Sequence, residues 1–100
     1  MGKKKRERSL EPEPIRIVPS FDRQFREDMG WWYRYDKKVA DRVWELVEAT
    51  MREPFSDIGK PEPLKYLAAN TWSRRITQEH RVIYQLDRDR IIFIQARYHY

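Results

Sequence analysis

The sequence has 100 residues, no cysteine and a formal net charge of +5, which indicates one domain and excludes disulfide bonds and thiolate metal sites. No apolar run approaches the roughly 20 residues of a membrane span, and no apolar segment of a secretory signal follows the basic stretch at residues 3–6. We therefore expect a soluble, cytoplasmic protein. Residues 60–100 carry eight basic and four acidic side chains, and this excess of positive charge favours a polyanionic partner such as nucleic acid.

The predicted elements begin after residue 14. Residues 1–14 combine many charges and two prolines with no periodic apolar pattern, which is typical of a disordered basic arm or of sequence left over from cloning. Residues 15–100 are predicted to form a single domain. Alternation at residues 15–18 predicts a short strand that Pro19 ends, and Ser20 is a plausible N-cap for the helix that follows.

Two helices are predicted next. Apolar residues recur at helical spacing from Phe21 to Trp32, although Gly30 weakens this helix. Asp36 is placed to cap a second helix, which Pro54 stops. A tight connection at Asp36 would make the helices an antiparallel pair. The apolar face of the second helix comprises Val39, Val43, Leu46, Val47 and Thr50.

After Pro54 the pattern changes from helical to alternating. Residues 55–63, with one glycine and two prolines, are predicted to form a structured loop. Three alternating segments follow at 72–77, 81–86 and 91–98, and the short connections between them predict an antiparallel meander. The predicted fold class is α+β, with a small antiparallel β-sheet, joined by the N-terminal strand, packed on two N-terminal α-helices.

Each predicted strand has two faces, because successive side chains of a strand point to opposite sides. Alternation places Ile92, Ile94, Ala96 and Tyr98 on one side, and we expect the apolar side to pack on the helices. Arg74 falls among apolar side chains, so we expect it beyond the helices or at an edge. The opposite face is predicted to gather Arg75, Arg81, Arg97 and His99.

These residues suit the cleavage of RNA without a metal. Such a reaction needs a base for the 2′-hydroxyl, an acid for the leaving 5′-oxygen and cations for the charged phosphorane. His99 is the candidate acid, because histidine is the side chain that titrates near neutrality. Glu62 is the best candidate base, since Pro61 and Pro63 restrict its backbone. His80 is expected to be a turn residue.

Other chemistries have weaker support in the sequence. Two histidines and no cysteine give no recognisable metal spacing, and all three glycines are isolated, so no glycine-rich phosphate loop is present. Nothing resembles a nucleophile elbow. We therefore expect no cofactor and no metal.

Five blocks of sequence resemble the YoeB toxins, which belong to the RelE-like group of bacterial toxin–antitoxin modules. They are PF at 54–55, GKPEPLK at 59–65, WSRRIT at 72–77, EHRVIY at 79–84 and RYHY at 97–100. The resemblance covers approximately residues 15–100 and is densest after Pro54. It departs from the family in the 14-residue arm, in the loop SDIGK, in AANTW and at Gln78.

The resemblance implies the RelE-like microbial RNase fold and a toxin that cuts mRNA in the ribosomal A site, without a metal, through attack of the 2′-hydroxyl. Glu62 would be the general base, His99 the general acid and Arg81 the cation that stabilises the transition state. Tyr100 would hold the substrate nucleotide. The residues expected to contact substrate phosphate are Lys60, Lys65, Arg74, Arg75 and Arg97.

The resemblance also implies two protein partners: a cognate antitoxin similar to YefM, whose tail disturbs the C-terminal active site, and a second copy of the chain. Two alternatives remain open. One is a module of the same fold that binds RNA, the ribosome or the antitoxin without cutting. The other is a ribonuclease that acts on free RNA, which is disfavoured because the protein alone would have to align its substrate.

Overall fold

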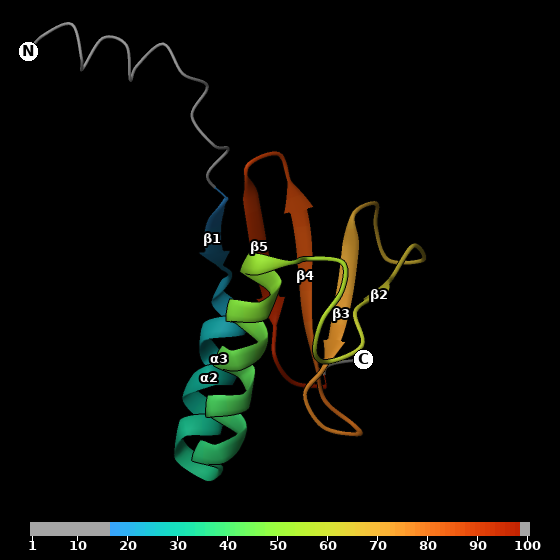
Figure 1. Ribbon diagram of the computed structural model, residues 1–100. Coiled ribbons are helices and arrows are strands. Elements are labelled where there is room, and N and C mark those ends of the chain that lie inside the picture. The colour runs from blue at the N-terminus through green and yellow to red at the C-terminus, as the bar shows by residue number, and fades with distance from the viewer. Residues whose placement is uncertain (1–16, 99–100) are drawn as a thin grey trace, which may run out of the picture.

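The computed structural model describes residues 17–98, which form two helices and five strands (Figure 1). Residues 1–14 and the two candidates His99 and Tyr100 therefore lie outside the described residues. Within residues 17–98, neither helix is long and apolar enough to cross a membrane.

The two helices form as their patterns predict, with a different start for the first. Helix α2 (Arg23–Tyr35) passes through Gly30, and its N-cap is Asp22. Ser20 was expected at that cap, but it lies in the preceding strand β1 (Val18–Phe21). Asp36 caps α3 (Lys37–Arg52) as expected, since its side chain accepts a hydrogen bond of 3.4 Å from the backbone N–H of Val39. The connection between the helices is thus a single residue.

The sheet has the strand order β1-β5-β4-β3-β2. Strands β2 (Glu62–Pro63), β3 (Thr71–Arg75), β4 (Arg81–Asp87) and β5 (Arg90–Gln95) pair antiparallel, whereas β1 pairs parallel with β5. The α+β prediction is confirmed, with a mixed rather than a purely antiparallel sheet. Pro19 does not end the first strand but lies within it, because β1 is an edge strand and a missing N–H costs little there.

One face of the sheet packs on the helices (Figure 1). The core between the two layers contains Phe25, Met29 and Trp32 from α2, Val43, Leu46 and Val47 from α3, and Val82, Tyr84, Ile91 and Phe93 from the sheet. The apolar stripes of both helices were predicted from their spacing and face this core. Of the residues predicted there, Val39 is only partly buried, and the partly buried Phe21 belongs to β1 and not to the first helix.

The faces of β5 differ from the prediction. Ile91 and Phe93 are fully buried against the helices, whereas Ile92 and Ile94 were expected there. Ile83 and Tyr84 are adjacent in β4, but their partners Gln95 and Phe93 are two residues apart, so Ile94 is the extra residue of a β-bulge. The extra residue shifts the side chains before it to the opposite face of the sheet. Simple alternation therefore assigns the wrong face to Ile91 and Phe93 and the right face to Ala96, which is fully buried.

Candidate active site

The candidate base and the candidate transition-state cation lie together at one side of the sheet. Glu62 is in the two-residue edge strand β2, where a loop was expected, and it pairs with Ser73 of β3. Arg81 begins β4, and its Nη1 lies 3.5 Å from the Glu62 carboxylate and 3.3 Å from the Ser73 hydroxyl. Residues 19 positions apart in the sequence thus form one ion pair.

This pair borders a hollow of about 440 Å³ whose other walls come from β4 and the turn after β2. Ile83 supplies part of the apolar wall, and the exposed Tyr66 stands at the rim with 81% of its surface accessible. Lys65 is exposed in the same turn, three residues after Glu62. The hollow therefore combines a carboxylate, a guanidinium and an exposed aromatic ring, and a ring of this kind can stack on a nucleobase.

Two expected phosphate ligands border a different hollow. Arg75 is the direct partner of Arg81 across β3 and β4, yet its side chain lines a second hollow, of about 320 Å³, with Lys60 and with Arg42 of α3. The Nε of Arg75 is buried there without a hydrogen-bond partner in the described part of the chain. Gly59 also lines this hollow, with a left-handed φ of 84°. Arg81 thus lies at the first hollow, whereas Arg75 and Lys60 lie at the second.

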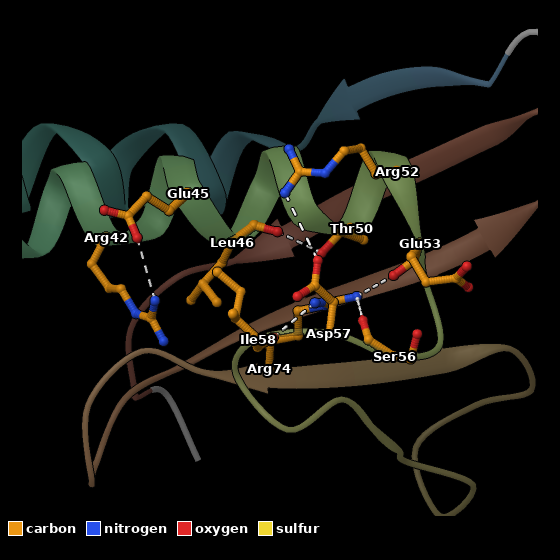
Figure 2. Close-up of polar contacts among 10 residues, drawn as sticks. All are labelled: Arg42, Glu45, Leu46, Thr50, Arg52, Glu53, Ser56, Asp57, Ile58 and Arg74. Atoms are coloured by element: carbon orange, nitrogen blue, oxygen red, sulfur yellow. Dashed lines mark hydrogen bonds and ion pairs between the residues drawn. The ribbon is translucent and has the colours of Figure 1, made fainter.

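Arg74 was expected to contact substrate phosphate, and the structure gives its side chain another environment. It is fully buried. Figure 2 shows its guanidinium directed at the loop after α3, where it donates to the carbonyls of Glu53, Ser56 (2.7 Å) and Ile58 (2.8 Å). A buried cation needs such acceptors, and the carbonyl end of a helix also favours positive charge. Arg74 therefore holds this loop against the sheet and presents no surface to a substrate.

Arg97 does not lie on the exposed face that was predicted for it. Its guanidinium lies over the ring of Trp31 in α2, with 3.7 Å between Cζ and the ring centroid. Its Nε is buried without a hydrogen-bond partner in residues 17–98. A guanidinium stacked on an indole is held by a cation–π interaction, so Arg97 contacts α2 rather than joining Arg75 and Arg81.

The Tyr84 hydroxyl lies in an environment that shifts its pKa. Burial raises the pKa of its hydroxyl above the usual 10.0, and a hydrogen bond from the Arg74 side chain opposes that rise. The hydroxyl donates to the carbonyl of Pro54 at 2.6 Å. Tyr84 thus belongs with Arg74 to the support of the loop, on the helix side of the sheet.

Sequence reasoning missed the roles of three residues, two of which line the hollows. Arg42 was assigned to a helix with no role, and Tyr66 was not singled out, although an exposed aromatic residue beside Lys65 was a usable signal. His80 lies in the expected turn, but its Nδ1 also accepts a hydrogen bond of 3.0 Å from the backbone N–H of Tyr98. No sequence pattern links residues 80 and 98. Among residues 17–98, no group of three or more His, Asp or Glu residues could hold a metal ion.

Comparison with known proteins places this architecture among bacterial toxins. A YoeB/ParE toxin from Agrobacterium tumefaciens superposes with a TM-score of 0.79 at 37% identity, over 84% of this chain and all of that one. A heterotetrameric YoeB–YefM toxin–antitoxin complex from Staphylococcus aureus (TM-score 0.74, 37% identity) and a YoeB dimer from the same organism (0.76, 36%) each cover 85% of this chain and 99% of theirs. The fold is therefore that of a toxin from a toxin–antitoxin system.

The sequence comparisons specify the family. Toxin YoeB of Mycobacterium bovis is 44% identical over 81 residues, which is 81% of this chain and 95% of that protein. Toxin YoeB of Escherichia coli K12 is 43% identical over 74 residues, 74% of this chain and 88% of the relative. The family model for YoeB-like toxins of bacterial type II toxin–antitoxin systems matches residues 21–100. This chain belongs to that family, as its sequence blocks predicted.

Proposed function

We propose that this chain is a ribosome-dependent endoribonuclease, the toxin of a type II toxin–antitoxin pair, which inhibits translation by cutting mRNA in the ribosomal A site. The observation that carries the proposal is the contact between Glu62 and Arg81 at the edge of an open hollow. Family membership supports the same reaction class. A base and a cation side by side are the arrangement that attack on a phosphodiester by its neighbouring 2′-hydroxyl requires.

The reaction divides into two proton transfers around one phosphorus. Glu62 accepts the proton of the 2′-hydroxyl as the new O2′–P bond forms, and Arg81 stabilises the charge on the phosphorane oxygens. His99 gives its proton to the 5′-oxygen as the P–O5′ bond breaks, leaving a 2′,3′-cyclic phosphate and a free 5′-hydroxyl. The substrate phosphate competes with Glu62 for the Arg81 guanidinium, and this exchange frees the carboxylate for the 2′-hydroxyl.

The two hollows then serve different parts of the RNA. Lys65 and Tyr66, beside the Glu62–Arg81 pair, contact the nucleotides next to the cut, and Tyr100 holds the substrate nucleotide. Arg75 and Lys60, joined by Arg42, contact backbone phosphates away from the reacting bond. In this proposal, the residues that cut the RNA and the residues that bind its backbone charge lie in two separate hollows.

The same proposal includes the protein partners. The solved Staphylococcus aureus relatives are a YoeB–YefM complex and a YoeB dimer. We therefore assign to this chain a YefM-like antitoxin that restrains it and a second copy of itself. A substrate on the ribosome places its activity in the cytoplasm.

The direct test is mRNA cleavage on programmed ribosomes, with chelator-treated protein and with His99→Ala as the comparison. A cut in the A-site codon by the intact chain, reduced about 100-fold or more in the variant, supports the proposal and the role of His99. Equal cutting by both proteins removes His99 from the mechanism.

One alternative has its own support. The basic hollow of Arg42, Lys60 and Arg75 needs no catalysis to bind RNA, so a non-cleaving module is the second candidate. Tight ribosome binding with intact mRNA would establish it. Digestion of RNA without ribosomes would instead indicate a free ribonuclease.

A further inference from the structure

The main chain just before His99 is held at every residue, and the first anchor is at Ala96. Its N–H donates to Asp28 Oδ2 at 2.8 Å, and its carbonyl accepts from Trp32 Nε1, also at 2.8 Å. Both partners are buried residues of α2, with Asp28 only 1% exposed. A buried carboxylate is retained where it satisfies backbone donors, so α2 fixes the position of the chain as it leaves β5.

The second anchor is at Arg97. Its side chain lies on Trp31, and its carbonyl accepts from Gln95 Nε2 at 3.2 Å. The direction of the chain is therefore fixed one residue further.

The third anchor is His80, which acts from the turn between β3 and β4 and not from α2. Its Nδ1 accepts the N–H of Tyr98 at 3.0 Å. The ring meets Trp32 edge-on, with 4.9 Å between centroids and an interplanar angle of 88°. The turn is itself held, because the Thr77 hydroxyl accepts the N–H groups of Glu79 and His80.

We propose that His80 is a positioning residue: by accepting the Tyr98 N–H, it fixes the point and direction from which the chain continues to His99. This hydrogen bond holds the last described peptide of the chain, at residue 98, which is bonded directly to residue 99. This inference rests on the proposed function, in which His99 is the general acid. An error of about 1 Å in placing such a group lowers a rate by as much as 100-fold.

Two substitutions separate this role from simple packing. His80→Phe keeps an aromatic ring against Trp32 and removes the acceptor. His80→Asn removes the ring, but its Oδ1 is attached through the same bonds as Nδ1 and keeps the acceptor. Glu79→Gln, at an exposed neighbour in the same turn, is the matched control.

The first measurement is steady-state cleavage of mRNA on programmed ribosomes. His80→Phe is expected to lower kcat about 10- to 100-fold with KM within about twofold, because substrate binding is unchanged while the acid is misplaced. His80→Asn is expected to recover most of that loss, and Glu79→Gln to match the natural chain. Equal loss in the Phe and Asn variants would assign His80 to packing and overturn the proposal.

The second measurement does not depend on activity. Hydrogen exchange of the Tyr98 amide is expected to be slowed at least about tenfold in the natural chain and in His80→Asn, and to be fast in His80→Phe. Unchanged exchange in His80→Phe would show that the hydrogen bond is not formed and would overturn the proposal. If the Tyr98 amide exchanges slowly but the natural chain does not cut mRNA, the hydrogen bond from Tyr98 to His80 is formed and the proposed function is wrong.

Discussion

At the level of single residues, the contacts of Arg81 with Glu62 and with Ser73 favour a role in function over one in stability. The side chains of the ion pair are 26% and 51% exposed. An ion pair open to solvent contributes about 0–1 kcal/mol to folding, so stability alone gives little reason for it. The position of the pair at the rim of the hollow indicates instead a role in binding or cutting a substrate.

Arg81→Ala is therefore expected to lower the rate of mRNA cleavage by about 100-fold or more and to change the unfolding free energy by no more than about 1 kcal/mol. Cleavage on programmed ribosomes and urea unfolding measure the two effects. Arg23→Ala, which removes the same charge from an exposed site on α2, is the control and should cut at the natural rate. Equal activity of both variants would remove Arg81 from the site.

The buried Tyr84 hydroxyl makes stability depend on pH in the alkaline range. Its pKa is higher in the folded chain than in the unfolded chain, so the unfolded chain loses this proton first as the pH rises. The contribution of Tyr84 is thus fully present below about pH 10 and is lost above it. Tyr84→Phe should cost about 1 kcal/mol at pH 8 and flatten the fall in stability above pH 10.

Urea unfolding between pH 8 and 11 measures this difference. The exposed Tyr35→Phe is the matched control and should follow the natural chain throughout. Parallel curves for the Tyr84→Phe variant and the natural chain would contradict the prediction.

At the level of elements, the loop between α3 and β2 lines the basic hollow with Gly59 and Lys60 and leads directly into β2, which carries Glu62. Arg74 donates to three of its carbonyls (Figure 2), and Tyr84 donates to a fourth. A Cβ at Gly59 would lie 2.6 Å from Leu46 Cδ2, so only glycine fits that close and left-handed position. Buried side chains thus fix the loop to the sheet, although the loop residues themselves are exposed or half-buried.

Arg74→Lys is expected to lower the unfolding free energy by about 3 kcal/mol, because a single ammonium group cannot satisfy three carbonyls that the guanidinium fork reaches together. Urea unfolding measures the loss. Arg52→Lys at the exposed end of α3 is the control and should stay within about 0.5 kcal/mol of the natural chain. A comparable effect at both positions would mean that the buried contacts of Arg74 carry no special weight.

The elements also show where sequence reasoning reached its limit. Helical spacing and the Asp36 cap predicted α2 and α3, because both signals are local. The faces of β5 were not predictable from alternation, since the bulge at Ile94 depends on its pairing with β4. The environments of Arg74 and Arg97 were missed for a similar reason: one depends on a loop 16 to 21 residues away, and the other on a tryptophan in α2.

At the level of the whole molecule, the topology brings Glu62 and Arg81 together and separates the remaining cations. Arg75 and Lys60 join Arg42 in a hollow of their own, while Arg97 lies on α2. The single basic face predicted from alternation therefore becomes two sites. If the proposed division holds, the binding of RNA and its cleavage respond to different substitutions.

Salt dependence tests this division. Each phosphate contact adds about 0.7–0.9 to the slope of log affinity against log salt. The double variant Arg42→Ala, Lys60→Ala is expected to bind programmed ribosomes more weakly and to reduce that slope by about 1–2, while kcat at saturation stays within about twofold. The control removes the same charge at the exposed Arg23 and Lys38 and should leave the slope unchanged. A fall in kcat with an unchanged slope would show that the residues of the basic hollow act in catalysis. Equal slopes for both double variants would show that the basic hollow contributes no more to binding than other exposed charges do.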